Sequence, residues 1–339
     1  MKPDYMLTVP SFLRSSDLRS VLGVAPSTFY EIFKKVRLES DGQKGHGVVR
    51  HVAPEEVRQI LQLRGYQYPA SAKVISFMMC KGGVGKTTSS FFVSQRLAAY
   101  GAKVLVIDAD PQGNLTSSFD LVQYGLSVSE KTPILVDVLE GKTSVEDSLL
   151  QLTPYLHLLP STLLNSNLES RIREKYRNVS TPMRALLKPL LSQYEYIFID
   201  CAPALNLTNT AMISASTMVI LPVAPDAYSQ IGMNQTLAEI HQIEKDFNFS
   251  VEKKILFTKF DAREFTSMKY LGEIAEKHGD KQFSTSIRIC ADVKNAIAEK
   301  TDLFSIRQSA AKEDYDRLAQ EVMGLSEKRS AKSVEGKAR

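Results

Sequence analysis

A glycine-rich octet carries the clearest chemical signal in the chain. It reads Lys81-Gly82-Gly83-Val84-Gly85-Lys86-Thr87-Thr88 and directly follows a run of apolar residues. Glycines let successive backbone N–H groups turn toward phosphate oxygens, and a helix that begins here adds its positive end. Lys86 would meet the β- and γ-phosphates of a nucleotide, and Thr87 would offer its hydroxyl group to Mg²⁺. The octet therefore predicts a binding loop for ATP or ADP with Mg²⁺.

Three aspartates follow two later apolar runs. Asp108 and Asp110 come after residues 104–107, and Asp200 comes after residues 196–199. Doubly wound sheets place ligands at the carboxyl ends of their parallel strands, so these side chains are expected near the phosphate-binding loop. The run that ends in Asp200 has the form of a Walker B strand, whose aspartate holds Mg²⁺ through water. Together with the octet, the order of these motifs indicates a nucleotide-hydrolysing site.

The octet departs from the ordinary phosphate-binding pattern at its start. Cys80 stands where that pattern has glycine, and Lys81 opens the loop. Lys-Gly-Gly-x-Gly-Lys-Thr is the deviant Walker A signature of the ParA/MinD family, which residues 73–325 resemble throughout. The resemblance implies that Lys81 reaches across a dimer interface to the nucleotide of a second subunit. We therefore expect a homodimer whose formation depends on ATP.

The same resemblance implies roles for further residues of the site. Asp110 would orient the attacking water, and Asp108 would support the Mg²⁺ shell. Lys259 and Phe260 would border the adenine. The family often carries Ile-Pro-Arg on its next strand, where this chain has Ile289-Cys290-Ala291. The expected catalytic residues are Lys81, Lys86 and Asp110. The expected metal ligands are Thr87, Asp108 and Asp200.

From residue 73 onward, apolar runs alternate with amphipathic helices. This alternation predicts an α/β fold, a mostly parallel and doubly wound P-loop NTPase sheet with helices on both faces. The predicted strands are 74–79, 104–107, 156–159, 196–199, 218–221, 255–258 and 283–287. The predicted helices include 87–100, 182–194 and 229–247.

The first 70 residues have a different pattern. A short helix, a turn at Gly23 and a second helix capped by Ser27 have the spacing of a helix-turn-helix. Residues 41–52 suit a β-hairpin wing, a helix from 54 to about 65 follows, and 67–72 has the composition of a linker. We therefore expect a small winged helix-turn-helix DNA-binding domain over 1–70, an ATPase domain over 71–325 and a basic disordered tail over 326–339.

Candidate DNA contacts lie in both predicted domains. On the second N-terminal helix they are Ser27, Thr28, Tyr30, Lys34 and Lys35. In the ATPase domain, Arg263 and Lys294 fall where family members place basic residues that face DNA, and such phosphate contacts do not read sequence. An alternative interpretation makes the N-terminal module a helical dimerisation unit that never touches DNA.

Composition excludes several classes of protein. The 339 residues carry a formal net charge of +4, which is compatible with a polyanionic partner but does not establish one. Cys80, Cys201 and Cys290 are widely spaced, so neither a disulfide framework nor a metal cluster is indicated. The chain lacks a long apolar run and the C-terminal amphipathic helix of membrane-bound relatives, so we expect no membrane contact and a cytoplasmic, nucleoid-associated protein.

These observations favour a DNA-partition ATPase of the larger ParA type. ATP would build a dimer that coats nucleoid DNA non-specifically, and a centromere-binding partner of ParB type would stimulate slow hydrolysis and release. The N-terminal domain would bind operator DNA for autoregulation. Two alternatives stay open: a transcription regulator gated by ATP, and a ParA-like ATPase that positions a protein cargo.

Overall fold

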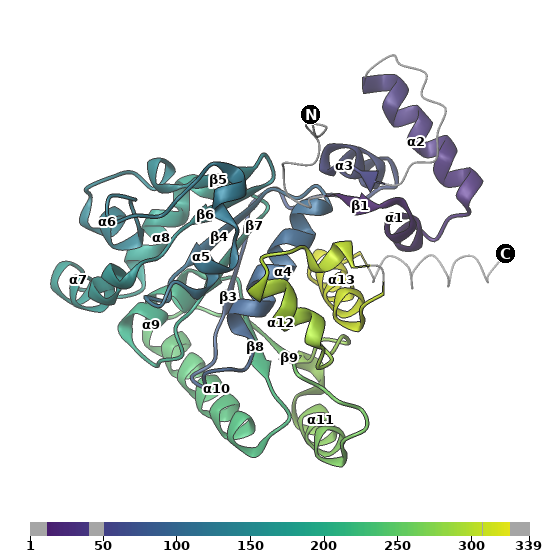
Figure 1. The fold of residues 1–339 in the computed structure, drawn as a ribbon. Coiled ribbons are helices and arrows are strands. Elements are labelled where there is room, and N and C mark those ends of the chain that lie inside the picture. Colours follow the sequence, from purple (N-terminus) through teal and green to yellow (C-terminus); the bar gives the residue numbers. More distant parts are fainter. Residues whose placement is uncertain (1–11, 41–50, 307, 326–339) are drawn as a thin grey trace.

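A seven-stranded sheet forms the centre of the molecule in the computed structural model, which describes residues 12–40, 51–306 and 308–325 (Figure 1). The strand order is β5-β6-β4-β7-β3-β8-β9, and neighbouring strands are parallel except for the pair β5 and β6. The strands are β3 (Lys73–Phe77), β4 (Val104–Asp108), β5 (Leu150–Thr153), β6 (Leu156–Leu159), β7 (Tyr196–Asp200), β8 (Met218–Val223) and β9 (Glu252–Phe257). The predicted α/β fold with a mostly parallel sheet is confirmed.

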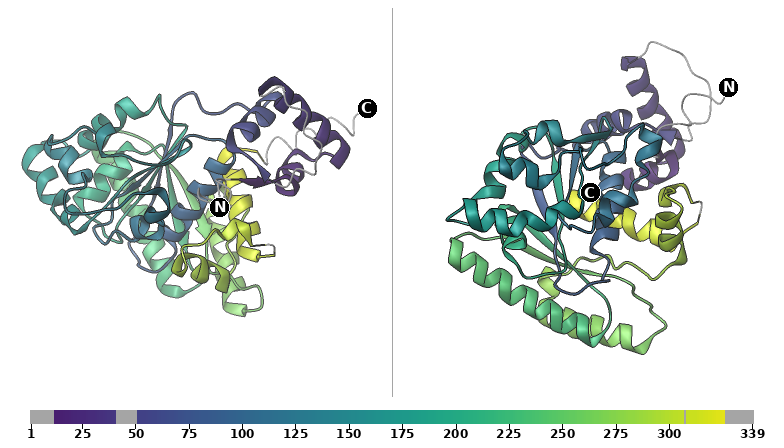
Figure 2. Two further views of the ribbon diagram at one scale, coloured as in Figure 1. Left: turned by 45° about the horizontal axis from the view of Figure 1, so that its top comes forward. Right: turned by 60° about the vertical axis from the view of Figure 1, so that its left-hand side comes forward.

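Helices cover both faces of this sheet, which is why β4 and β7 are apolar up to the aspartates that end them (Figures 1 and 2). Alternate residues of each strand face different sides: Val104 and Val106 belong to one buried cluster, and Leu105 and Ile107 to the other. The first face is covered by α4 (Lys86–Ala99), α12 (Ala291–Ala298) and α13 (Ala310–Met323). The second is covered by α6 (Leu135–Glu140), α7 (Leu168–Lys175), α8 (Thr181–Leu187), α9 (Leu207–Ala215) and α10 (Ala227–Phe247).

The sheet edges differ from the sequence prediction. Residues 283–287 form no strand, because the ladder beside β9 is interrupted. Isolated bridges join the flanking Gln282 to Ile255 and Arg288 to Phe260, and within the segment the backbone N–H groups of Phe283 and Ile287 donate to Ile255 and Phe257 at 3.0 and 2.7 Å. The edge strand β5 was not predicted, and it pairs with β6 through an irregular register. The predicted helix 182–194 ends as α8 at Leu187 and continues as a 3₁₀ turn that contains Pro189, a residue without a backbone N–H to donate.

The N-terminal module contains α1 (Ser15–Leu22), α2 (Pro26–Ser40), α3 (Pro54–Leu63) and a two-stranded ribbon of β1 (Leu13–Arg14) with β2 (His51–Val52). Gly23 ends α1 in the left-handed conformation (φ 64°), as the predicted turn requires. The cap prediction for Ser27 is wrong, since α2 begins one residue earlier at Pro26, whose fixed φ suits the first helical position. Most of the predicted wing, 41–50, and the whole tail 326–339 lie outside the described residues.

A buried ionic cluster joins this module to the ATPase core. Arg96, in the last turn of α4, is 1% exposed and pairs with Asp17 of α1 at 3.1 Å and Asp316 of α13 at 2.5 Å. The hydroxyl group of Tyr100 donates to the same Asp316 at 2.7 Å. The segment 67–72 is also fastened to the core, because the hydroxyl group of Tyr68 donates to the carbonyl oxygen of Tyr100 at 2.6 Å. The helix that begins at the phosphate-binding loop therefore ends against the N-terminal module.

Candidate nucleotide site

The glycine-rich loop lies between the end of β3 and the start of α4, the strand-loop-helix arrangement in which loop N–H groups and a helix N-terminus can bind one phosphate group. Gly83 and Gly85 have φ of 72° and 91°, in the left-handed region that a residue with a side chain rarely adopts. The end of β9 fastens the loop from outside: the Thr258 hydroxyl donates to the carbonyl oxygen of Val84 at 2.7 Å, and the Lys259 ammonium donates to that of Gly83 at 2.6 Å.

Lys86, Thr87 and Asp200 meet at the inner end of this loop. The Thr87 hydroxyl donates to Oδ2 of Asp200 at 2.6 Å, and the Lys86 ammonium donates to the carbonyl oxygen of Lys81 at 3.3 Å. Burial raises the pKa of Asp200 well above its usual range, and the nearby Asp108 adds to that effect. Burial also lowers the pKa of Lys86, while the charge of Asp200 opposes the shift. A cation beside Asp200 and an anion beside Lys86 would therefore each stabilise the charged form of that side chain.

The environment of Asp200 fits a bound Mg²⁺. Its carboxylate is fully buried, and Oδ1 has no hydrogen-bond partner among the described residues. An unpartnered buried carboxylate oxygen is unfavourable unless a cation or its water shell reaches it. Asp200 and the Thr87 hydroxyl supply the oxygen ligands that Mg²⁺ prefers, and the phosphates of a nucleotide would complete the set.

Asp108 and Asp110 sit on the neighbouring strand but make different contacts. Asp108 pairs in register with Asp200, and its Oδ2 accepts from the backbone N–H and the hydroxyl group of Thr116 at 2.8 and 2.7 Å. Burial raises the pKa of Asp108 to about 6 despite these hydrogen bonds. Asp110 is 7% exposed and accepts only from the backbone N–H of Gln112 at 3.0 Å among the described residues, so its carboxylate keeps free acceptor capacity.

Lys81 is held on the protein surface by the first turn of α10. Its ammonium group donates to Asp226 at 2.6 Å and to the Ser229 hydroxyl at 2.9 Å. Asp226 also caps α10 by accepting from the backbone N–H of Ser229 at 2.9 Å. Sequence reasoning missed both partners, although an aspartate directly before a helical pattern is an N-cap signal. Gly232 on the same helix leaves room for Cys80, whose sulfur would lie 3.4 Å from an added Cβ.

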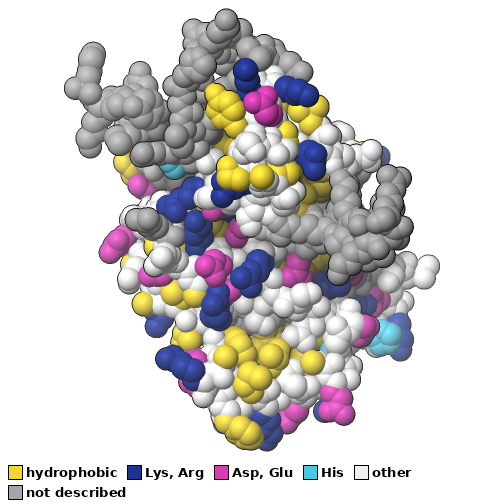
Figure 3. Space-filling view, turned by 90° about the vertical axis from the view of Figure 1, so that its right-hand side faces the viewer, with side chains coloured by type: hydrophobic (Ala, Val, Ile, Leu, Met, Phe, Trp, Pro, Cys, Tyr) yellow, Lys and Arg dark blue, Asp and Glu magenta, His cyan; other side chains and the backbone are white. Residues whose placement is uncertain are grey.

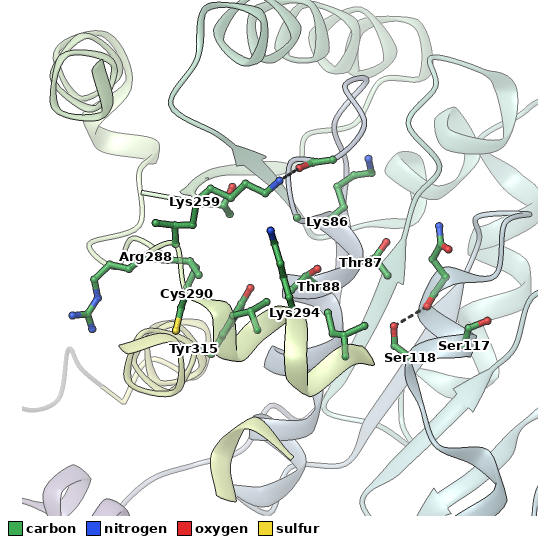
Figure 4. A pocket seen from close by; sticks show the side chains of 18 residues that line it. Lys86, Thr87, Thr88, Ser117, Ser118, Lys259, Arg288, Cys290, Lys294 and Tyr315 are labelled. Carbon is green, nitrogen blue, oxygen red and sulfur yellow. Dashed lines mark hydrogen bonds between the residues drawn. The ribbon is translucent and has the colours of Figure 1, made fainter. Parts of the chain in front are cut away.

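A cavity of about 610 Å³ extends from the loop toward α12 (Figure 4). Thr88 and Lys259 line it at the loop end, and an apolar wall faces them. That wall consists of Ile287, Ile289, Val293, Ile297 and the ring of Tyr315. Phe260, expected beside the adenine, is not among the lining residues and packs against the second buried cluster. Lys294, expected to face DNA, lines this cavity and is also exposed.

The remaining candidate DNA contacts are accessible as well. Side chains of α2 that were singled out from the sequence are all exposed: Ser27, Thr28, Tyr30, Lys34 and Lys35. This helix projects from the body of the molecule (Figures 1 and 2). Arg263 is also exposed, but its guanidinium group forms a two-point ion pair with Asp261 at 2.9 and 2.7 Å. On the face in Figure 3, basic side chains are interspersed with acidic ones rather than gathered into one basic patch.

No helix in the described part of the chain is long and apolar enough to cross a membrane.

Comparison with known proteins places the sheet and loop in a family. A protein-family model described as an AAA domain matches residues 72–253. The chain is 29% identical to the chromosome partitioning protein ParA of Caulobacter vibrioides over 77% of this chain and 98% of that protein. It is 30% identical to the sporulation initiation inhibitor protein Soj of Bacillus subtilis, over 74% of this chain and 98% of that protein.

Solved structures repeat the fold. An ATP complex of a Cyanothece McdA variant superposes with a TM-score of 0.68 at 24% identity, covering 75% of this chain and 97% of that one. The match to the AAA-domain model starts at residue 72, so α1, α2 and α3 lie outside it. The described loop, its buried Asp200 and these matches agree: the chain belongs to the ParA/Soj family of P-loop partition ATPases.

Proposed function

We propose that this protein is a DNA-partition ATPase whose dimer forms around ATP, binds nucleoid DNA and is released when a ParB-type partner stimulates hydrolysis. The meeting of Lys86, Thr87 and the buried Asp200 at one end of a nucleotide-sized cavity carries the proposal. Family membership supports the ATPase activity.

In the proposed reaction, the P-loop and Lys86 hold the β- and γ-phosphates, and Asp110 orients the attacking water. The free acceptor capacity of Asp110 and its position near Lys86 and Asp200 support this role. Mg²⁺, held by Thr87 and by Asp200 through water, would neutralise charge on the phosphates. Asp108 has a structural role in this proposal, because its hydrogen bonds to Thr116 hold α5 (Asn114–Ser118) next to the site.

The ion pair that Lys81 forms within its own chain supports an ATP-dependent change from monomer to dimer. Its ion pair with Asp226 is partly exposed on both sides (31% and 42%), and exposed pairs contribute only about 0–1 kcal/mol. Lys81 can therefore leave Asp226 at little cost when the more highly charged triphosphate of a second subunit approaches. An Asp110→Ala chain, which retains ATP, should elute from gel filtration as a dimer with ATP and as a monomer with ADP. An unchanged elution position would contradict the dimer.

The N-terminal module is proposed to bind operator DNA through the exposed face of α2. Non-specific binding to the nucleoid would use basic residues of the ATPase domain, and a DNA phosphate at Arg263 must compete with Asp261. The test is duplex binding by the full chain with ATP, ADP or no nucleotide, on operator and random DNA across a salt series. Binding that is the same in all three nucleotide states would contradict the switch.

One structural observation favours the second candidate, an ATP-gated transcription regulator. Helix α4 begins at the phosphate-binding loop and contacts Asp17 of the N-terminal module through Arg96, so the ATPase is in position to act on α1. A Lys34→Gln/Lys35→Gln chain separates the two functions, because both lysines are exposed and their replacement leaves the packed module intact. A partition ATPase should keep ATP-dependent binding to random DNA, whereas a pure regulator should lose all DNA affinity.

A ParA-like positioning ATPase for a protein cargo would run the same cycle and differ only in its partner. A neighbouring gene for a centromere-binding protein would favour partition over this alternative.

A further inference from the structure

The cavity beside the phosphate-binding loop is lined by cationic side chains and by no carboxylate among its described lining residues. The cations are Lys86, Lys259, Lys294 and Arg288. A site that gathers positive charge in this way is suited to a polyanion. The four cations are not equivalent, however, because they differ in the partners that they already have.

Three of the four are engaged within the chain. Lys86 donates to the carbonyl oxygen of Lys81, and Lys259 donates to that of Gly83. The guanidinium group of Arg288 pairs with Asp314 at 2.7 Å and with Glu313 at 3.3 Å. Lys294 has no hydrogen bond or ion pair with any described residue, and its side chain extends from α12 into the cavity (Figure 4). Its charge is therefore available to a ligand there.

The packing of α12 determines that direction. Cys290, Val293, Lys294 and Ile297 all line the cavity, and their spacing of i, i+3, i+4 and i+7 corresponds to one face of a helix. Val293 and Ile297 pack against the first buried cluster, and Ala296 is 1% exposed. Lys294 cannot turn away from the cavity by a rotation of α12 without exposing these apolar contacts.

We propose that Lys294 is a nucleotide-binding residue that contacts the phosphate chain from its nucleoside side, rather than a contact to DNA. The γ-phosphate end is assigned to Lys86 and Thr87, and the apolar wall of α12 is suited to the nucleoside, so Lys294 stands between them. This contact is common to ATP and ADP, since it does not depend on the γ-phosphate. The inference rests on the proposed ATPase function.

The test compares Lys294→Met with the wild-type full chain in titrations with a fluorescent ADP analogue and with ATPγS, both in Mg²⁺. A lost hydrogen bond between charged groups should weaken both nucleotides by a similar factor of about ten to one hundred. Lys300→Met is the matched control, because Lys300 is exposed just beyond the end of α12 and does not line the cavity. Lys294→Arg, which keeps the cation, should recover most of the affinity.

A second arm measures binding to random duplex DNA at saturating ATP, where a nucleotide defect no longer matters. Lys294→Met should keep the wild-type affinity and salt dependence in this arm. Nucleotide affinities within about two-fold of wild type would overturn the proposal, whatever the DNA result. A Lys294 that contacts DNA would instead show a lower DNA affinity and a salt slope reduced by about 1. Failure of the wild-type chain to bind nucleotide at all would refute the ATPase proposal itself.

Discussion

Replacing Arg96 by methionine should lower the free energy of unfolding far more than replacing an exposed arginine on a helix would. The guanidinium group is 1% exposed and lies between Asp17 and Asp316, with the ring of Phe304 at 4.7 Å from its central carbon. Methionine keeps much of the side-chain volume but removes the charge. Two half-buried carboxylates, each 17% exposed, would then lose their main partner.

The expected loss is about 3 kcal/mol, the lower end of the range of about 3–5 kcal/mol for breaking a buried ion pair. The lower end applies because both acids keep other contacts. Asp316 still accepts from Tyr100 and from Gln320 at 2.9 Å, and Asp17 retains Lys312 at 3.3 Å. A loss of this size is a large part of the roughly 5–15 kcal/mol that usually stabilises a folded chain.

The assay is urea unfolding followed by circular dichroism, with Arg317→Met as the matched control. Arg317 lies on the same helix as Asp316 and is 64% exposed, and its one ion pair within the described residues is a 4.0 Å contact with Glu313. Its replacement should therefore change stability by less than about 0.5 kcal/mol. Limited trypsin digestion adds a second measurement, because a loosened α1 should speed cleavage of the N-terminal module. The reasoning is refuted if Arg96→Met is no less stable and no more sensitive to trypsin than the Arg317→Met control.

Three further predictions concern the junction, pH and metal. Gly101→Ala should lower the urea midpoint markedly, because Gly101 has φ 78° and an added Cβ would lie 2.4 Å from the carbonyl oxygen of Pro54; unchanged stability would mean that α3 moves freely. Burial raises the pKa of Asp302 from 3.8 to about 6. Between these two pH values the folded chain holds a proton on Asp302 that the unfolded chain has released, so the free energy of unfolding falls as pH rises from about 4 to 6. Asp302→Asn, which can still cap its turn, should therefore gain up to about 3 kcal/mol on the wild type between pH 4 and 7, and a pH-independent difference would contradict this. Asp200→Asn should keep an acceptor for Thr87 but lose the Mg²⁺-dependent part of the thermal stabilisation by ADP; an intact Mg²⁺ effect in calorimetry would exclude Asp200 from the metal site.

The central sheet was predictable from the sequence because strands that are buried on both faces read as continuous apolar runs. The apolar residues of β4 and β7 divide between two clusters, so every position in those strands must be apolar until the aspartates that end them. The edges carry weaker signals. β5 is half-exposed and irregularly paired. In 283–287 only Phe283 and Ile287 are buried and apolar, and the isolated bridges to the sheet edge come from the flanking Gln282 and Arg288.

By itself, the sequence determined the phosphate-binding loop, the α/β sheet and the aspartates that end β4 and β7 beside that loop, because loop chemistry and strand burial are local properties. Only the tertiary structure decided where the charged side chains point. Lys81 meets Asp226 and Arg96 meets Asp316 across long separations in sequence. Lys294 lines the cavity beside the phosphate-binding loop because its neighbours on α12 pack against the first buried cluster. Long side chains take their direction from the packing of whole elements, and no local pattern of residues contains that information.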